Sequence, residues 1–574
     1  MRIRSLVALA VPAALFAAAS PGCSTEEPSD TSDPTAEADY TSSGLCNGLP
    51  KLNLKTPAGM CVGIVAEGIT FARGMTQLPN GDVIVASMGG WALNKGSIWR
   101  IRKGADGKYT KTQVQTLIDK PSGVQFNKKD GLVYVGTPSD IFRMDPNLTP
   151  RPKLQQVLRT ANPNGARHPL KQFVFDANNP DILYVNIGSA SDNGETNGVY
   201  ERNPLDEQQD RGAIRKYVLE GPERLAKTAD PTSPHCKNPA PAAGQKCPSE
   251  YTVFARGLRN SMALVMHPSG TLLQGENSRD SINKRAPELS SREGELPQEE
   301  LNVVTEGTHY GWPFCYGNNV PSPEYRTWDC SGYKTPALLL PGHSSPLGAR
   351  YYDGALFPSV YKGSIIVALH GYRENGHRVV MVPADARGVP SGEPMDIIRG
   401  WEKTATNPLG APVDVMVAQD GSIWVTEDKN GTVLRIFYDK TAGNGLPLKT
   451  LPPVHPVVDP AEASRCQALN GRNSAFADVQ KNVIDPYCVS CHGAGPGYAG
   501  GLALLKCDDV GNYKRLLAPR RNGAPAYVIP RNPNGSEFLQ RIKGNGYPQM
   551  PAGGVSPEGV HEIESWINAG APQP

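Results

Sequence analysis

The sequence lacks the long apolar run of a membrane-spanning helix, and it lacks an excess of charge of either sign. Its formal net charge is +2 over 574 residues, so its charge gives no support to a nucleic-acid partner. No Gly-x-Gly-x-x-Gly motif follows a predicted strand and opens a helix, which argues against a nicotinamide or flavin site on a Rossmann unit. The 60 Gly and 53 Pro residues favour a turn-rich β protein, and the length predicts two or more domains.

The N-terminus has the features of an export signal. Basic residues at positions 2 and 4 precede an apolar run from Leu6 to Ala19, which is too short to span a membrane as a stable helix. The run ends in Ser20-Pro21-Gly22-Cys23 and resembles a bacterial lipoprotein signal, in which a lipid on Cys23 would anchor the protein to a membrane. Ordinary cleavage with an incidental Cys23 is the alternative. We expect residues 1–22 to be the signal peptide and residues 23–45 a disordered tether.

Eight further cysteines fall as close neighbours in the sequence. An even set in an exported protein predicts disulfides, and sequence-local pairing is the simplest of the possible connectivities. None of them has the spacing of zinc ligands. The neighbours are Cys46 and Cys61, Cys236 and Cys247, Cys315 and Cys330, and Cys466 and Cys507.

One local pattern returns between residues 62 and 438: a turn with Gly or Asp leads into an alternating strand, often followed by a second strand. Six recurrences at irregular but blade-like intervals predict an all-β six-bladed β-propeller with long insertions. A β-sandwich array is the alternative, but it would not repeat this one sequence pattern. We assign residues 46–440 to the propeller.

Near the C-terminus, the sequence Cys488-Val489-Ser490-Cys491-His492 is the CxxCH pattern of covalent haem c attachment. Cys488 and Cys491 would bind the porphyrin vinyl groups, and His492 would be the proximal iron ligand. For the sixth ligand we prefer Met550, in an irregular loop, because a thioether is the usual partner of histidine in cytochromes c. His561, on the last predicted helix, is the alternative.

Helical signals surround the haem motif. Residues 475–487 predict a helix that runs into it, and Ser556-Pro557 offers an N-cap and first residue for a last helix, which Gly570 can end. The CxxCH motif, the Met-Pro loop and the closing Trp-Ile-x-x-Gly helix resemble those of class I cytochrome c domains at the ends of exported bacterial enzymes. We expect a linker over 441–460 and a small all-α cytochrome c domain over 461–574.

A single haem carries one electron and makes no substrate chemistry, so we expect the propeller to hold a two-electron cofactor. Three polar clusters lie beside the strands of the repeat. They are Arg167-His168; Arg259-Asn260 with Glu276-Asn277-Ser278-Arg279, Glu300-Leu301-Asn302 and Tyr310-Gly311-Trp312-Pro313; and His370-Gly371-Tyr372-Arg373. At these clusters the sequence resembles the soluble quinoprotein glucose/sorbosone dehydrogenase family, over roughly residues 62–438.

The resemblance implies a six-bladed propeller that holds pyrroloquinoline quinone (PQQ) and Ca²⁺ at its axis and oxidises aldose sugars or related alcohols and aldehydes. It implies His168 as the catalytic base and the backbone carbonyls of Ser278 and Arg279 as Ca²⁺ ligands. Arginines suit the carboxylates of PQQ because they bind them in bidentate fashion. The implied cofactor-binding residues are Arg259, Asn260, Asn277, His370 and Arg373.

The last blade departs from the family. Ala411 precedes Pro412-Val413, where members often have an arginine, so one carboxylate-binding residue is missing or moved. The glutamine that lies near the cofactor in glucose-oxidising members has no clear counterpart either. These departures concern the binding of PQQ and not the fold.

The preferred hypothesis is an exported dehydrogenase of sugars or alcohols, with PQQ as oxidant and the haem as the outlet to an external acceptor, a cytochrome or the quinone pool. It predicts a periplasmic or cell-envelope lipoprotein. The alternative is a degenerate propeller that binds a carbohydrate or protein partner, with the haem as electron relay or redox sensor, and Ala411 favours it. A purely structural surface lipoprotein would leave the haem unexplained.

Overall fold

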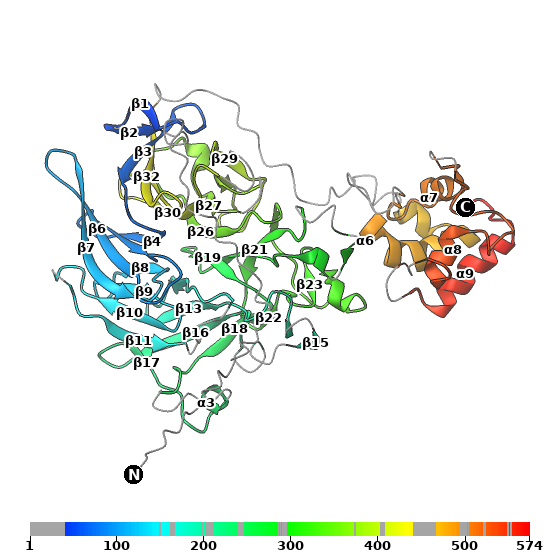
Figure 1. Ribbon diagram of the computed structural model, residues 1–574, viewed down its shortest axis with the longest axis horizontal. Helices are drawn as coiled ribbons and strands as arrows, with labels where there is room; N and C mark the ends of the chain where they lie inside the picture. Colours follow the sequence, from blue (N-terminus) through cyan, green and yellow to red (C-terminus); the bar gives the residue numbers. More distant parts are fainter. Residues whose placement is uncertain are drawn as a thin grey trace, which may run out of the picture.

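Six β-sheets, antiparallel except for one marginal strand pair, surround a common axis and form a β-propeller over residues 41–438 (Figure 1). A small helical region follows it. This computed structural model describes residues 41–148, 151–160, 167–196, 199–202, 206, 210–237, 246–284, 286–287, 289, 295–371, 375–401, 408–439, 466–492, 502, 504–520, 524–547, 550 and 554–574.

The first three blades contain the strands between Ala72 and His309. The first has β4 (Ala72–Gln77), β5 (Val83–Ser87), β6 (Gly96–Lys103) and β7 (Tyr109–Ile118). The second has β8 (Val124–Asn127), β9 (Leu132–Gly136), β10 (Asp140–Met144) and β11 (Gln155–Arg159). The third has β12 (Phe173–Phe175), β13 (Ile182–Ile187), β16 (Ala213–Glu220) and β18 (Thr252–Arg256), with β17 (Leu225–Ala226) and β22 (Thr308–His309) at its margins.

The other three blades follow the same order from the axis outward. The fourth has β19 (Ser261–Met266), β20 (Leu272–Glu276), β21 (Glu299–Val304) and β25 (Leu338–Leu340). The fifth has β26 (Pro346–Tyr351), β27 (Ile365–Leu369), β28 (Arg378–Val382) and β29 (Met395–Ile398). The sixth has β30 (Pro412–Val417), β31 (Ile423–Glu427), β32 (Thr432–Tyr438), β3 (Met60–Ala66), β2 (Leu49–Leu52) and β1 (Thr41–Cys46).

Short elements occupy the insertions between these strands. They are the hairpins β14 (Glu195–Thr196) with β15 (Val199–Arg202) and β23 (Cys315–Tyr316) with β24 (Val320–Pro321), the helix α3 (Pro234–Lys237), and the 3₁₀ turns η1 (Ile282–Lys284), η3 (Pro323–Tyr325) and η4 (Ser359–Tyr361).

The ring is closed by the N-terminal part of the chain. The inner strands touch in the order β4, β8, β12, β19, β26 and β30, and β30 returns to β4. The strand β3 pairs antiparallel with β32, from Met60 beside Tyr438 onward, so the first segment of the propeller completes its last blade. The predicted six-bladed propeller is confirmed. The tether expected up to residue 45 overlaps β1, which begins at Thr41 because it pairs with β2.

The recurring sequence pattern forms the turn that leads into the second strand of each blade. In the first blade Gly81 has φ 87°, and in the last Gly421 has φ 80°; this left-handed conformation favours glycine. A turn of this kind reverses the chain between an inner strand and its antiparallel neighbour. The repeated pattern therefore identifies the same turn, between the first and second strands, in every blade.

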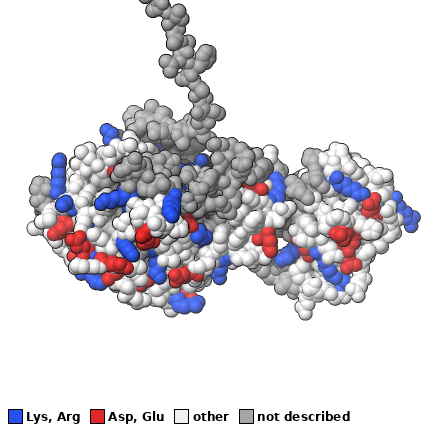
Figure 2. All heavy atoms as spheres, turned by 90° about the horizontal axis from the view of Figure 1, so that it is seen from below, with Lys and Arg blue, Asp and Glu red and all other residues white. Residues whose placement is uncertain are grey.

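Lys and Arg side chains alternate with Asp and Glu on the face that Figure 2 shows. This mixture agrees with the small net charge. Among the helices of the described residues, none combines the length and the apolar character needed to cross a membrane.

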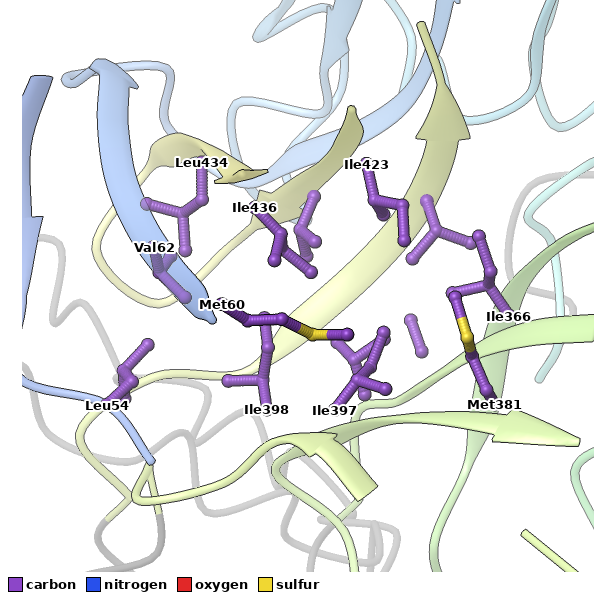
Figure 3. Close-up of a cluster of buried hydrophobic side chains, with 14 of the residues drawn as sticks. Leu54, Met60, Val62, Ile366, Met381, Ile397, Ile398, Ile423, Leu434 and Ile436 are labelled. Atoms are coloured by element: carbon purple, nitrogen blue, oxygen red, sulfur yellow. The ribbon is translucent and has the colours of Figure 1, made fainter. Parts of the chain in front are cut away.

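Apolar side chains fill the space between neighbouring blades. Figure 3 shows the cluster between the fifth and sixth blades, where Ile366 and Met381 of the fifth lie near Met60, Ile423 and Ile436 of the sixth. Each of these side chains is fully buried. Burial of a large aliphatic side chain is worth about 1.5–3 kcal/mol, so these interfaces hold the ring of blades in a fixed arrangement.

The C-terminal region is helical, as predicted. It contains α5 (Ala475–Val479), the π-helical segment η5 (Gln480–Cys488), α6 (Val489–His492), α7 (Asp509–Leu517), α8 (Glu537–Lys543) and α9 (Pro557–Asn568). Ser556 caps α9 by accepting a hydrogen bond from the Gly559 amide at 3.1 Å. The first and last helices meet through Phe476 and Trp566, whose ring centroids are 4.7 Å apart.

Four disulfides have the sequence-local pairing that the cysteine positions predict. They are Cys46–Cys61, Cys236–Cys247, Cys315–Cys330 and Cys466–Cys507. Stable disulfides form in oxidising compartments, so they indicate a protein that works outside the cytoplasm. Cys23, the signal peptide and the linker over 441–460 lie outside the described residues.

Candidate active site

The predicted site residues of the propeller lie at one edge of its blades. In each blade the inner strand is antiparallel to the second strand, so the start of one lies beside the end of the other; Ser261 pairs with Glu276 in the fourth blade. Ring closure brings this edge of all six blades to the same face. The residues are His168 before β12, Arg259 and Asn260 before β19, Asn277 and Ser278 after β20, and His370 after β27.

An apolar cluster lies where the inner strands begin on this face. Five blades contribute to it, and it forms an apolar floor between the polar residues. The buried members are Met88, Leu170, Met262, Leu347 and Val413, and the half-buried Phe71 packs against them. Phe71 has φ 51°, a conformation that bulky residues rarely adopt and that is typical of functional sites.

His168 is half-buried at the margin of this floor and has a defined tautomer. Its Nδ1 lies 3.1 Å from the Ser189 carbonyl and 2.9 Å from the Ser189 hydroxyl oxygen. That hydroxyl donates its own proton to the Ser191 carbonyl at 2.6 Å, so both Ser189 oxygens accept from His168. The Nδ1 atom therefore carries the proton, and the lone pair lies on Nε2. A Cβ at Gly188 would lie 2.5 Å from the His168 Cβ, so this close approach requires glycine.

The surroundings of His168 favour its neutral form. Burial first, and then the positive charges of Arg259 and Arg167, lower the pKa of His168 well below its usual value. A neutral imidazole with its lone pair on Nε2 can accept a proton from a substrate hydroxyl.

Arg259 is buried, and its guanidinium is held by carbonyls and acids. Its Nη1 donates to the carbonyls of Asn277 at 2.9 Å and Ser278 at 2.6 Å. Its Nη2 donates to Asp192 at 2.8 Å and lies 3.0 Å from Asp280. Although burial acts in the opposite direction, Arg259 holds the pKa of Asp192 below its usual value. The Arg259 Nε has no hydrogen-bond partner among the described residues.

Buried carboxyl groups fix the loop that follows β20. Glu276 accepts a hydrogen bond from the Asn260 amide at 2.9 Å, and Glu299 accepts one from the Ser278 amide. Burial raises the pKa of Glu276 and of Glu299 to about 8. Burial also raises the pKa of Glu300, which pairs across the strands with Glu276, to about 7. The loop therefore rests on carboxyl groups that titrate near neutral pH.

His370 belongs to a second ionic cluster, whose residues come from the fifth, sixth and first blades. Its Nε2 lies 3.0 Å from one oxygen of Asp428, and the other oxygen of Asp428 lies 3.0 Å from the Arg73 guanidinium. Although burial acts in the opposite direction, His370 and Arg73 hold the pKa of Asp428 below its usual value. Arg373, predicted to bind a carboxylate nearby, lies outside the described residues.

In the helical region, Cys488 is buried in the apolar core, and His492 is oriented by a backbone carbonyl. The His492 Nδ1 lies 2.8 Å from the Leu502 oxygen; because a carbonyl only accepts, Nδ1 donates and the lone pair lies on Nε2. Metal-binding histidines usually have this second hydrogen bond. The side chain of Cys491 lies outside the described residues.

The two candidates for the sixth iron ligand differ in burial. Met550 is half-buried, and its amide donates to the Arg541 carbonyl at 2.8 Å. His561 is exposed on α9. The preference for Met550 stays a prediction.

Comparison with known proteins agrees with the propeller. A family model described as TrAA12-like matches residues 235–438. A curated protein of Borreliella burgdorferi, described as uncharacterized, is 28% identical over 198 residues, which are 33% of this chain and 49% of that protein. The chain thus spans about half the length of the curated relative it matches.

Two solved structures share the fold. The holo form of the PQQ domain of pyranose dehydrogenase from Coprinopsis cinerea has a TM-score of 0.52 and 18% identity, covering 68% of this chain and 99% of that one. The calcium structure of the family AA12 enzyme of Trichoderma reesei has a TM-score of 0.53 and 18% identity, covering 67% of this chain and 97% of that one. The propeller of this chain therefore has the same fold as these two proteins.

The site residues fit PQQ better than Ca²⁺. The apolar floor suits a planar ring, and the Arg259 Nε without a partner suits one of its carboxylates. However, the Ser278 carbonyl, predicted as a Ca²⁺ ligand, accepts from Arg259, so a cation there would meet a guanidinium. As placed, the Ser278 carbonyl does not fit Ca²⁺, and we derive no step through the cation.

Four residues of the site were not anticipated from the sequence. Ser189 orients His168, Asp192 holds Arg259, and Asp428 holds both Arg73 and His370. Asp192 lies in an insertion without a repeated pattern. Arg73 could have been found from the sequence, because it lies at the start of an inner strand, as Arg259 does.

Proposed function

We propose that this chain is an exported dehydrogenase that oxidises an aldose sugar or a related alcohol or aldehyde with PQQ and releases the electrons through a covalent c-type haem. The observation that carries the proposal is His168: a neutral imidazole with Nε2 as its basic atom, beside an apolar floor and a buried arginine. This arrangement suits the removal of a proton from a hydroxyl group on a carbon that loses hydride.

Each part of the site has a distinct task in this proposal. His168 accepts the hydroxyl proton on Nε2, and Ser189 keeps the ring in the required tautomer. Arg259 and Asn260 bind cofactor oxygens, and the floor around Met262 excludes water beneath the reacting carbon. When bound, PQQ supplies an electrophilic carbonyl that accepts hydride. Asn277 and His370 are the remaining proposed cofactor contacts in the described residues.

The haem proposal rests on the helical region. Cys488 and Cys491 would hold the porphyrin, His492 would bind iron through Nε2, and Met550 would be the sixth ligand. When bound, the haem supplies a one-electron outlet towards a cytochrome or the quinone pool. The hydrogen bond from His492 to Leu502 supports this role because it directs the lone pair of the imidazole.

The experiment has two steps. The cofactor of the natively purified protein is extracted and tested for PQQ by mass, and the haem absorption of PQQ-loaded protein is then followed with a panel of sugars, alcohols and aldehydes. We expect substrate-dependent haem reduction, and its loss in His168→Ala. The matched control is His267→Ala, because His267 lies in the turn after β19, at the other edge of the blades. A full panel without haem reduction would reject the proposal.

One observation favours a second candidate, a degenerate propeller that binds a carbohydrate or protein. Both terminal nitrogens of Arg259 already have acidic or carbonyl partners, and position 411 is alanine. A ligand that binds only the folded state must raise its melting temperature. An unchanged melting temperature with PQQ and Ca²⁺ would therefore favour this candidate.

A further inference from the structure

A chain of ionic contacts connects three consecutive blades on the site face. Arg73 comes from the first blade. Asp428 directly follows β31 in the sixth blade, and His370 directly follows β27 in the fifth. Asp428 lies 3.0 Å from each of the other two side chains. The side chains of Arg73 and Asp428 are 7% and 8% exposed, so the contact between them is shielded from water.

Arg73 keeps an unused donor. Its Nε is buried and has no hydrogen-bond partner among the described residues. A buried donor of a charged group is costly to leave without a partner, so such a group calls for an acceptor that binds there. In a ring of six, the first blade lies across from the fourth, which holds Arg259 with the same unpaired Nε. Two such arginines therefore come from opposite blades of the ring.

Arg73 also lies close to position 411, where this chain has an alanine in place of an arginine. The Asp428 amide donates to the Ala411 carbonyl at 3.2 Å, and the Ala411 amide donates to Glu427 at 2.8 Å. Position 411 and Asp428 are thus neighbours across the ladder of the sixth blade. The guanidinium that binds Asp428 consequently brings a positive charge close to Ala411, from the adjacent blade.

We propose that Arg73, positioned by Asp428, is a second carboxylate-binding residue of the axial site and replaces an arginine at position 411. The inference rests on the proposed function, because it takes a planar polycarboxylate such as PQQ as the ligand. Asp428 does not bind the ligand; it holds Arg73 on one side and His370 on the other. The floor includes Leu347 of the fifth blade and Val413 of the sixth, the two blades that lie between Arg259 and Arg73 in the ring.

The test measures PQQ binding to the full chain by the shift in melting temperature and by titration, without any activity assay. Arg73→Gln is expected to weaken PQQ binding about 10- to 100-fold, the usual effect of losing a hydrogen-bonded charge partner. The control is Arg100→Gln. Arg100 also has a buried Nε without a partner and an acid nearby, Asp82 at 3.8 Å, but it lies on β6, away from the site.

A second ligand isolates the role of charge. PQQ trimethyl ester keeps the ring and lacks the negative charges, so Arg73→Gln should change its affinity by no more than about twofold. Arg73→Gln/Asp428→Asn removes both partners of the ion pair and guards against a fold lost to an unpaired acid. The double variant should show the same selective loss of PQQ.

The outcomes separate the two proposals. Wild-type protein that binds neither ligand would reject the PQQ function itself. Wild-type binding that Arg73→Gln leaves unchanged, or a loss equal for PQQ and its ester, would overturn the role of Arg73 and leave the PQQ function standing. A loss confined to PQQ, absent in Arg100→Gln, would support carboxylate binding by Arg73.

Discussion

At the scale of single residues, the protonation of His168 makes a direct kinetic prediction. Burial and two arginines lower the pKa of His168 well below its usual value, which is about 6.5. The base form is then present on both sides of pH 6.5. We predict that kcat/KM for substrate oxidation shows no histidine inflection near pH 6.5 and falls only at lower pH. A pH profile of kcat/KM measures this.

Two variants give the profile its controls. Ser189→Ala removes one acceptor of the His168 Nδ1 and should lower kcat/KM roughly 10- to 100-fold, as loss of an orienting partner does. His168→Ala should lose about 10²- to 10⁴-fold. A wild-type inflection near pH 6.5 that disappears in His168→Ala would contradict the low pKa.

The sequence was informative for residues that lie in a local motif and silent for those joined by ring closure. His168, Arg259 and His370 could be selected because each stands beside a strand of the repeat. Arg73 and Asp428 are more than 350 positions apart by their numbers, and only the contact between the first and sixth blades brings them together. No local spacing carries that information.

At the scale of elements, turns were predictable and strand partners were not. The glycine turns before β5 and β31 are local, because the left-handed residue is visible as Gly81 or Gly421. The cap of α9 is local too, because Ser556 and the Gly559 amide that it accepts from are three residues apart. By contrast, the pairing of β3 with β32 has no local signal. The tether was drawn too far, across β1, which pairs with β2 through the turn at Asn47 and Gly48.

The buried acids of the fourth blade predict how stability depends on pH. Burial, followed by the nearby Glu300, raises the pKa of Glu276 to about 8, above its value in the unfolded chain. The stability that this group contributes is complete below the unfolded pKa and is lost as pH rises through 8. Each such proton gives a slope of about −1.4 kcal/mol per pH unit. We predict that Glu276→Gln, which keeps an acceptor for Asn260, flattens the slope between pH 5 and 8.

Chemical denaturation at a series of pH values measures this slope. The control Glu67→Gln changes an exposed acid and should leave the slope as in the wild type. Equal slopes for the wild type and Glu276→Gln would show that Glu276 is ionised in the folded protein.

At the scale of the whole molecule, propeller and helical region have separate apolar cores. The core around Phe476, Cys488 and Trp566 contains residues of the helical region alone, and the blade clusters contain residues of the propeller alone. Each part therefore has a hydrophobic core of its own, as a separate domain does. Substrate oxidation and electron release are therefore expected to be separable by mutation.

Cys488→Ser/Cys491→Ser makes this separation testable. Without the two thiols no haem is attached covalently, while the floor, His168 and Arg259 are unchanged. We predict normal melting of the propeller and substrate oxidation with a soluble dye as acceptor, but no reduction of an external cytochrome. Haem staining of the denatured protein and the two acceptor assays measure these properties. The control Cys236→Ser/Cys247→Ser also removes two cysteines, from a propeller disulfide, and should keep the haem. Dye reduction lost together with the haem would show that the haem takes part in the oxidation itself and is not its outlet.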